Sequence, residues 1–114
     1  MALRIDEKES GGVTVLTLAG RITLGEESNQ LRTKIKELLA QGKKRLVLDL
    51  GGVSYIDSAG LGNLVAAYTS TRSEGGEIHL ANITKKFGEL LSITKLLTIF
   101  DVHTSVADAL KSFS

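Results

Sequence analysis

At residues 46–50 the chain reads Leu46-Val47-Leu48-Asp49-Leu50, a short run that is almost wholly apolar. A run of this length and composition is typical of a strand that is buried on both faces. Such strands occur in parallel sheets, which have helices packed on both sides. The run therefore predicts a central strand of an α/β fold. Residues 51–58, which follow it, are rich in turn-forming residues and predict a connection.

The segment before this run predicts a hairpin. Leu3 and Ile5 alternate with polar residues, and a second alternating segment covers residues 13–18. Gly11-Gly12 lies between the two segments, and paired glycines suit a tight hairpin turn. We therefore expect the first two strands to pair antiparallel.

Helices are predicted where apolar side chains recur at intervals of three and four residues. Such a stripe covers residues 26–41, and Gly42 suits the C-terminal cap of that helix. The later elements are expected in this order: a helix that begins near Ala59 and ends before Gly75-Gly76, a strand at residues 77–81, a helix capped by Thr84, a short strand at residues 97–100, and a helix capped by Thr104 or Ser105.

Strands and helices alternate after the hairpin, and this order predicts an α/β fold. We expect a mixed, mostly parallel sheet of about four to five strands with about four helices, in which the first two strands are antiparallel. The chain has 114 residues, a common size for one domain, and it contains no proline and no low-complexity linker. A single domain over residues 1–114 is therefore expected.

The composition excludes several classes of function. Cysteine is absent, which excludes disulfides, thiolate zinc sites and a cysteine nucleophile. The net charge is only +1, so no strong field indicates a nucleic-acid partner. No apolar run approaches the roughly 20 residues of a membrane span, and the N-terminus lacks the apolar core of a signal peptide. A cytoplasmic protein without membrane insertion is expected.

The most informative segment is Tyr55-Ile56-Asp57-Ser58-Ala59-Gly60-Leu61-Gly62, between the buried strand and the next helix. In α/β folds, sites form at the carboxyl ends of the strands. Either Asp57 or Ser58 suits the N-cap of the helix. A phosphate on Ser58 would lie at the helix N-terminus, where free N–H groups and the helix dipole favour negative charge.

Gly60 and Gly62 fall within the first turns of this helix, where each glycine costs about 1 kcal/mol of helix propensity. Two explanations remain open for them. The absent side chains allow another protein or a nucleotide to approach Ser58 closely, or they allow tight packing of the helix against a strand.

No catalytic constellation is evident. A dinucleotide fingerprint fails because Val65 occupies the third glycine position, and there is no P-loop lysine. Asp57 lacks the acidic companions of a receiver domain, and no nucleophile elbow surrounds Ser58. His79 is expected on a polar strand face and His103 in a loop. We therefore expect a protein that is not an enzyme and that holds no cofactor and no metal.

The segment at residues 57–62 resembles the phosphorylation motif of the STAS domain, specifically that of bacterial anti-sigma factor antagonists. The resemblance extends over essentially the whole chain. It includes residues 18–22, 46–50, 53–56, 75–76 and 106–110. Two positions depart from the family pattern, because Thr23 replaces an aspartate found in many members and Ala59 replaces a second hydroxyl.

The resemblance implies a partner-switching regulator of sigma-factor-dependent transcription. It implies that Ser58 is the phospho-acceptor, that the partner is an anti-sigma factor serine/threonine kinase which itself binds ATP and magnesium, and that a phosphatase restores the serine. Residues that contact the partner or position the loop would be Asp57, Ala59, Gly60, Leu61, Gly62 and Asn63. The alternatives are a STAS scaffold subunit of a sensory or lipid-transport complex, and a small nucleotide- or anion-binding module.

Overall fold

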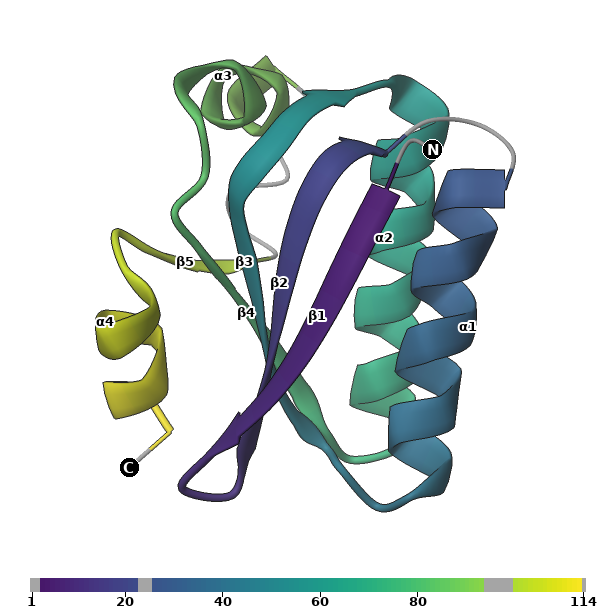
Figure 1. The fold of residues 1–114 in the computed structure, drawn as a ribbon, viewed down its shortest axis with the longest axis vertical. Coiled ribbons are helices and arrows are strands. Elements are labelled where there is room, and N and C mark those ends of the chain that lie inside the picture. The colour runs from purple at the N-terminus through teal and green to yellow at the C-terminus, as the bar shows by residue number, and fades with distance from the viewer. Residues whose placement is uncertain (1–2, 23–25, 94–99, 114) are drawn as a thin grey trace.

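The computed structural model describes residues 3–22, 26–93 and 100–113, which form one sheet with helices on both of its faces (Figure 1). The strands are β1 (Leu3–Ser10), β2 (Val13–Ile22), β3 (Arg45–Ile56), β4 (Glu77–Ala81) and β5 (Asp101–His103). The helices are α1 (Glu26–Ala40), α2 (Ser58–Ser73), α3 (Lys85–Ile93) and α4 (Val106–Lys111).

The five strands are arranged in the order β1-β2-β3-β4-β5. β1 and β2 pair antiparallel, and every other neighbouring pair is parallel. Gly11 and Gly12 form the β1–β2 turn with φ values of +56° and +83°, which a tight hairpin of this type requires. The predicted fold class, a mostly parallel mixed sheet that begins with an antiparallel pair, is confirmed.

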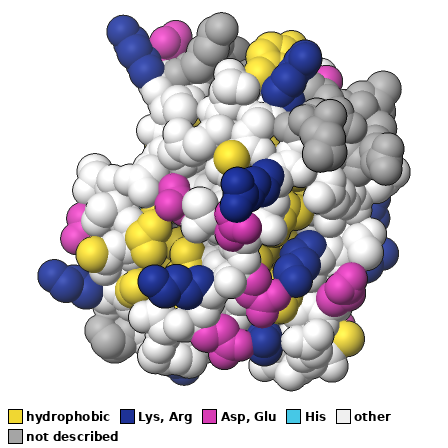
Figure 2. All heavy atoms as spheres, in the orientation of Figure 1, with side chains coloured by type: hydrophobic (Ala, Val, Ile, Leu, Met, Phe, Trp, Pro, Cys, Tyr) yellow, Lys and Arg dark blue, Asp and Glu magenta, His cyan; other side chains and the backbone are white. Residues whose placement is uncertain are grey.

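Helices α1 and α2 cover one face of the sheet, and α4 covers part of the other (Figure 1). The larger core lies between the sheet and α1 and α2, with Phe87 and Leu91 of α3 included in it. The smaller core lies under α4 and consists of Val13, Val15, Val47, Ala81 and Ala109. Outside these cores, Figure 2 shows acidic and basic side chains interspersed over the face that carries β1.

The connection predicted after residue 50 is wrong in its first part, because β3 continues to Ile56. The strand register between β2 and β3 shifts near Thr17, where the glycines of β3 pass beside β2. A Cβ on Gly52 would lie 2.9 Å from the carbonyl oxygen of Leu18. The glycines therefore mark an irregularity within a strand, which allows close approach of the backbones, and not a turn between elements.

The predictions for both histidines are also wrong. His79 is only 5 % exposed and lies beneath α4. The alternation with Ile78 and Leu80 predicted that this strand face is polar, but α4 covers it. His103 is the last residue of β5. The strand predicted at residues 97–100 falls mainly outside the described residues, and β5 begins at Asp101.

Candidate functional site

Helix α2 begins at Ser58, and Asp57 is its N-cap. The backbone of Asp57 is extended, and its Oδ1 accepts a hydrogen bond of 2.7 Å from the N–H of Gly60. The carbonyl oxygen of Asp57 accepts the next helical bond, 2.9 Å from the N–H of Leu61. The cap that the sequence left open between two residues is therefore supplied by Asp57, and the helix begins one residue before the predicted Ala59.

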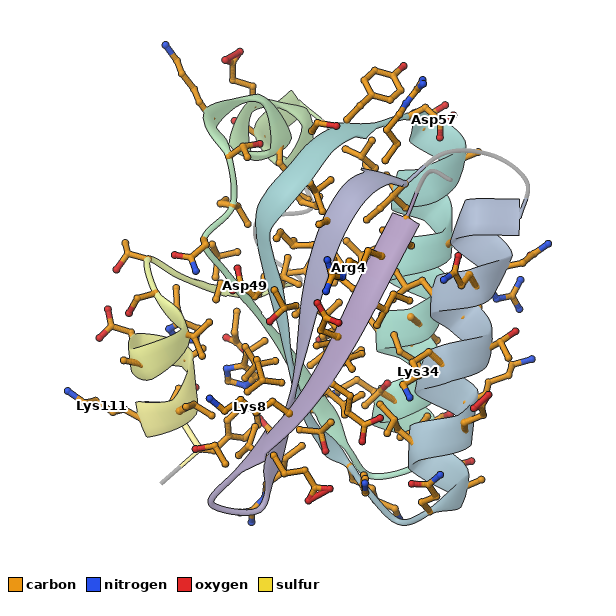
Figure 3. The ribbon with its side chains drawn as sticks, in the orientation of Figure 1. Arg4, Lys8, Lys34, Asp49, Asp57 and Lys111 are labelled. Atoms are coloured by element: carbon orange, nitrogen blue, oxygen red, sulfur yellow. The ribbon has the colours of Figure 1, made fainter. Side chains whose placement is uncertain are left out.

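Ser58 is the first helical residue, and its side chain is exposed. It follows Asp57 at the end of the molecule where the ribbon enters α2 (Figure 3). Because Asp57 serves as the cap, the Ser58 hydroxyl is not the group that caps the helix. The hydroxyl is thus presented to solvent beside the free N–H groups of a helix N-terminus.

The two glycines of the motif have different surroundings. A Cβ on Gly60 would collide with the backbone carbonyl of Ile22, at the end of β2. Gly60 is therefore required for close packing of α2 on the sheet, the second of the two explanations left open by the sequence. Gly62 is exposed, and a Cβ there would meet no atom within 4 Å. Only Gly62 leaves open space on the outer surface beside Ser58.

The other motif residues divide between the core and the surface. Leu61 is buried in the larger core, and Ala59 is half-buried. Asn63 is held in place because its amide donates to the Ala59 carbonyl at 3.0 Å and its Oδ1 accepts from Arg32 of α1 at 3.5 Å. The predicted phospho-acceptor Ser58 is exposed. Of the predicted contact residues, Gly62 is exposed and Asn63 is half-buried, whereas Gly60 and Leu61 are buried and support the helix. Thr23 lies outside the described residues.

Tyr55 and Arg21 extend the site beyond the predicted residues. Tyr55 is the one large hydrophobic side chain among the described residues that is clearly exposed, at 44 %. Its strand partner on β2 is Arg21, whose guanidinium carbon lies 5.2 Å from the centre of the tyrosine ring. Each residue is the last but one of its strand, at the edge of the sheet where α2 begins. The sequence alone could have placed Tyr55 beside Arg21 only if residues 51–56 had been interpreted as a strand.

Away from this site, Lys34 of α1 and then Lys43, in the connection after α1, lower the pKa of Glu7 on β1 through hydrogen-bonded ion pairs. Within residues 3–22, 26–93 and 100–113, no cluster of three or more histidine, cysteine, aspartate or glutamate side chains could hold a metal. In the same ranges, no helix is long and apolar enough to cross a membrane.

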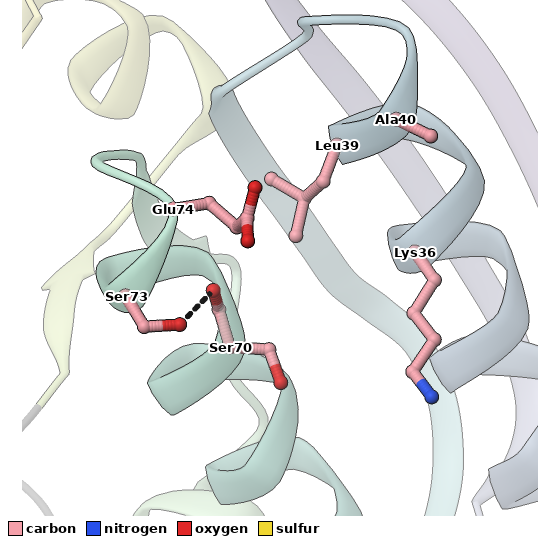
Figure 4. A pocket seen from close by; sticks show the side chains of 6 residues that line it. All are labelled: Lys36, Leu39, Ala40, Ser70, Ser73 and Glu74. Atoms are coloured by element: carbon pink, nitrogen blue, oxygen red, sulfur yellow. Dashed lines mark hydrogen bonds between the residues drawn. The ribbon is translucent and has the colours of Figure 1, made fainter.

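A shallow groove of about 350 Å³ lies between the last turns of α1 and α2 (Figure 4). Lys36, Leu39 and Ala40 line it from α1, and Ser70, Ser73 and Glu74 line it from α2 and its C-cap. Ser58 is at the other end of α2, which has 16 residues and is therefore roughly 24 Å long. The groove is thus separate from the Ser58 surface.

Comparisons with known proteins agree with this geometry. The sequence model of the STAS domain matches residues 4–109. The anti-sigma-B factor antagonist of Bacillus subtilis is 32 % identical over 102 residues, which are 90 % of this chain and 92 % of that protein. The crystal structure of TM1081 from Thermotoga maritima is 26 % identical with a TM-score of 0.87, and the match covers 95 % and 92 % of the two chains.

The phosphorylated form of SpoIIAA from Bacillus is similar in fold. Its TM-score is 0.74 at 18 % identity, and the match covers 97 % of this chain and all of that one, at 100 %.

Proposed function

The chain belongs to the STAS domain family, and we propose that it is an anti-sigma factor antagonist that acts by partner switching in the bacterial cytoplasm. In its unphosphorylated form it binds an anti-sigma factor that is also a serine/threonine kinase, and the sigma factor is set free. Phosphorylation of Ser58 dissociates the complex. The observation that carries the proposal is the exposed hydroxyl of Ser58 at the start of α2, beside a cap that Asp57 supplies.

The comparisons support the same reading. A curated relative that matches 90 % of this chain is an anti-sigma factor antagonist. SpoIIAA, which shares the fold, has been solved in a phosphorylated and in an unphosphorylated form. An exposed serine at this helix start is the group on which such a modification would be placed in this chain.

The chemistry requires little of this chain beyond an accessible nucleophile. The Ser58 oxygen attacks the γ-phosphorus of ATP, the new O–P bond forms, and the bond to the β–γ bridging oxygen breaks so that ADP leaves. The kinase supplies ATP, magnesium and the base that takes the hydroxyl proton. A phosphatase later hydrolyses the phosphoserine and restores the hydroxyl.

Release follows from the charge that the phosphoryl group adds. A phosphoserine carries about −1.5 to −2 charges at neutral pH. In the free protein, the N–H groups at the start of α2 and the helix dipole stabilise that charge. In the complex, the same charge would be buried against the kinase and its catalytic acid, at a cost of several kcal/mol. Because about 1.4 kcal/mol is a tenfold change in affinity, repulsion suffices without any refolding of this chain.

The docking surface is formed by side chains that surround Ser58. Gly62 offers open space and Asn63 a fixed amide on α2, while Tyr55 and Arg21 stand at the ends of β3 and β2. Tyrosine and arginine are the residue types that most often dominate the binding energy of protein interfaces. We assign the anchoring contacts with the kinase to this pair and the approach of the active site to Gly62.

The direct test is capture of the kinase followed by phosphorylation with ATP and magnesium. Wild-type protein incubated with the captured kinase should gain one phosphate by intact mass, and Ser58→Ala should bind but gain none. Ser92→Ala, which removes an exposed hydroxyl on α3, is the matched control and should behave as wild type. Ser58→Asp should bind at least about tenfold more weakly. Equal affinity of Ser58→Asp and wild type would refute the electrostatic mechanism.

A further inference from the structure

Strand β1 forms one edge of the sheet, because it comes first in the order β1-β2-β3-β4-β5. All of its residues pair with β2 without a register shift, and residues 4 and 6–10 are exposed. Proline and β-bulges are devices by which edge strands avoid further pairing. β1 contains neither of them. The charged side chains of β1 therefore decide which partner can pair with this edge.

Alternate residues of β1 direct their backbone groups outward. The two-residue turn after β1 makes the flanking pair Ser10–Val13 a hydrogen-bonded pair, so the even-numbered residues of β1 bond with β2. The N–H and C=O groups of residues 3, 5, 7 and 9 therefore point away from the sheet. In agreement with this, the carbonyl of Leu3 accepts a bond of 3.4 Å from the side-chain amide of Gln30, outside the sheet.

The side chain of Ile5 lines an open groove between β1 and α1. Ile5 is half-buried and packs against the larger core. The groove has a volume of about 450 Å³. Its other walls come from polar residues of α1, which are Asn29, Gln30, Thr33, Lys34 and Glu37. A strand that paired with the β1 edge would direct every second side chain to this side of the sheet, next to Ile5.

The opposite face of β1 carries alternating charges. Arg4, Asp6 and Lys8 share this face, and Nε of Arg4 is 3.2 Å from Oδ2 of Asp6 (Figure 3). When a strand pairs antiparallel with a second copy of itself, facing side chains lie on the same side of the sheet. One residue must therefore lie on the two-fold axis and meet its own copy.

The charges leave one such register. Residues 4 and 6–9 are all charged, and any of them on the axis would meet its own charge. Leu3 and Ser10 are at the ends of the strand, where the axis would leave few residues to pair. With Ile5 on the axis, Arg4 of each copy lies opposite Asp6 of the other, and no like charges face each other within residues 3–7.

We propose that the β1 edge binds a second copy of this chain in an antiparallel pair with Ile5 on the two-fold axis. The two Ile5 residues exchange backbone hydrogen bonds, and their side chains pack together beside the groove. Glu7 then faces Leu3 of the second copy and keeps its ion pairs with Lys34 and Lys43. A pair of this size belongs to the class of small, transient interfaces. It uses no residue of the Ser58 surface.

The test measures self-association of the full chain by sedimentation velocity. Wild-type protein should shift from monomer to dimer between about 10 µM and 1 mM. Arg4→Asp opposes two carboxylates on each side of the axis and should weaken the dimer at least about tenfold. Lys8→Asp makes the same change in net charge outside residues 3–7, and its effect should stay within about threefold.

The exchange of both charges provides the decisive variant. Arg4→Asp combined with Asp6→Arg restores opposite charges across the axis without a change in net charge, so its dimer should be within about threefold of wild type in affinity. Wild-type protein that stayed monomeric up to about 1 mM would overturn the proposal. A double variant as weak as Arg4→Asp, or a Lys8→Asp variant equally weak, would overturn it too.

Amide hydrogen exchange by NMR gives a second readout. The N–H of Ile5 points outward in the monomer, whereas that of Asp6 bonds with β2. As the protein concentration rises, protection of the Ile5 amide should increase in step with the dimer fraction, and that of Asp6 should stay constant. If a dimer formed while exchange at Ile5 was independent of concentration, another surface would make the contact and the proposal would be wrong.

Discussion

The backbone N–H of Asp57 donates to the carbonyl oxygen of Ile22 across 3.2 Å, and this bond ties the first turn of α2 to the end of β2. The same carbonyl blocks any side chain at Gly60. Residues of the motif that face this junction support the helix, whereas those that face outward are available to a partner. Substitutions at the two kinds of position should therefore have different effects.

Asp57→Ala should destabilise the protein by about 1 kcal/mol, with a range of roughly 0.5–2, because the N–H of Gly60 loses its acceptor. The free energy of unfolding in urea measures the loss. Asp57→Ser retains a capping oxygen and should recover most of it. If Asp57→Ala unfolded at the wild-type urea concentration, the cap would contribute nothing to stability.

Gly60→Ala should cost about 1–3 kcal/mol or more, because the new methyl group meets the Ile22 carbonyl and the helix must move. Gly62→Ala is the matched control, since its methyl group enters open space and alanine favours a helix over glycine by about 1 kcal/mol. Thermal unfolding of the two variants should shift in opposite directions. Shifts of equal size and sign would contradict the close packing at Gly60.

Tyr55→Ala should weaken binding of the kinase at least about tenfold, since it removes an exposed aromatic anchor beside Ser58. Its stability should change by less than about 0.5 kcal/mol because the side chain is exposed. Titration calorimetry with the purified kinase measures the affinity. Lys8→Ala is the control and should bind like wild type, because Lys8 lies on β1 well away from Asp57 and the start of α2 (Figure 3).

Glu7→Gln should lower stability at neutral pH by at most about 1 kcal/mol. Lys34 and Lys43 lower the pKa of Glu7 in the folded protein below its ordinary value of 4.5. The contribution of the carboxylate is therefore present above about pH 4.5 and is lost as the pH falls through the folded pKa. Urea unfolding at a series of pH values should show the wild type and variant converging in acid. If the difference in unfolding free energy between wild type and Glu7→Gln grew as the pH fell, the prediction would be wrong.

The periodic parts of the fold could be predicted from the sequence. The run at residues 46–50 and the alternation of strands and helices are local signals, and β4 was predicted at the bounds observed. The second half of β3 could not be predicted, because Gly51-Gly52 signals a turn unless the neighbouring strand is known to pass beside it. His79 was placed wrongly for a similar reason, since the covering helix α4 lies far along the chain.

The candidate site was predictable in type but not in detail. A helix start after a buried strand could be located, but aspartate and serine are almost equally good caps, so only the geometry assigns Asp57. Gly60 and Gly62 are indistinguishable in the sequence. Their roles differ because Ile22, 38 positions before Gly60, abuts only one of them.

The hydrogen-bonded junction between β2 and α2 limits how partner proteins can bind at Ser58. Because the start of α2 is held in place, Ser58 cannot move toward one partner protein while another is still bound. Under the proposed function, the anti-sigma factor kinase and the phosphatase must therefore bind the same surface around Ser58, and only one of them can be bound at a time. The phosphorylated fraction of this protein would then depend on the relative concentrations of the two partners as well as on their catalytic rates.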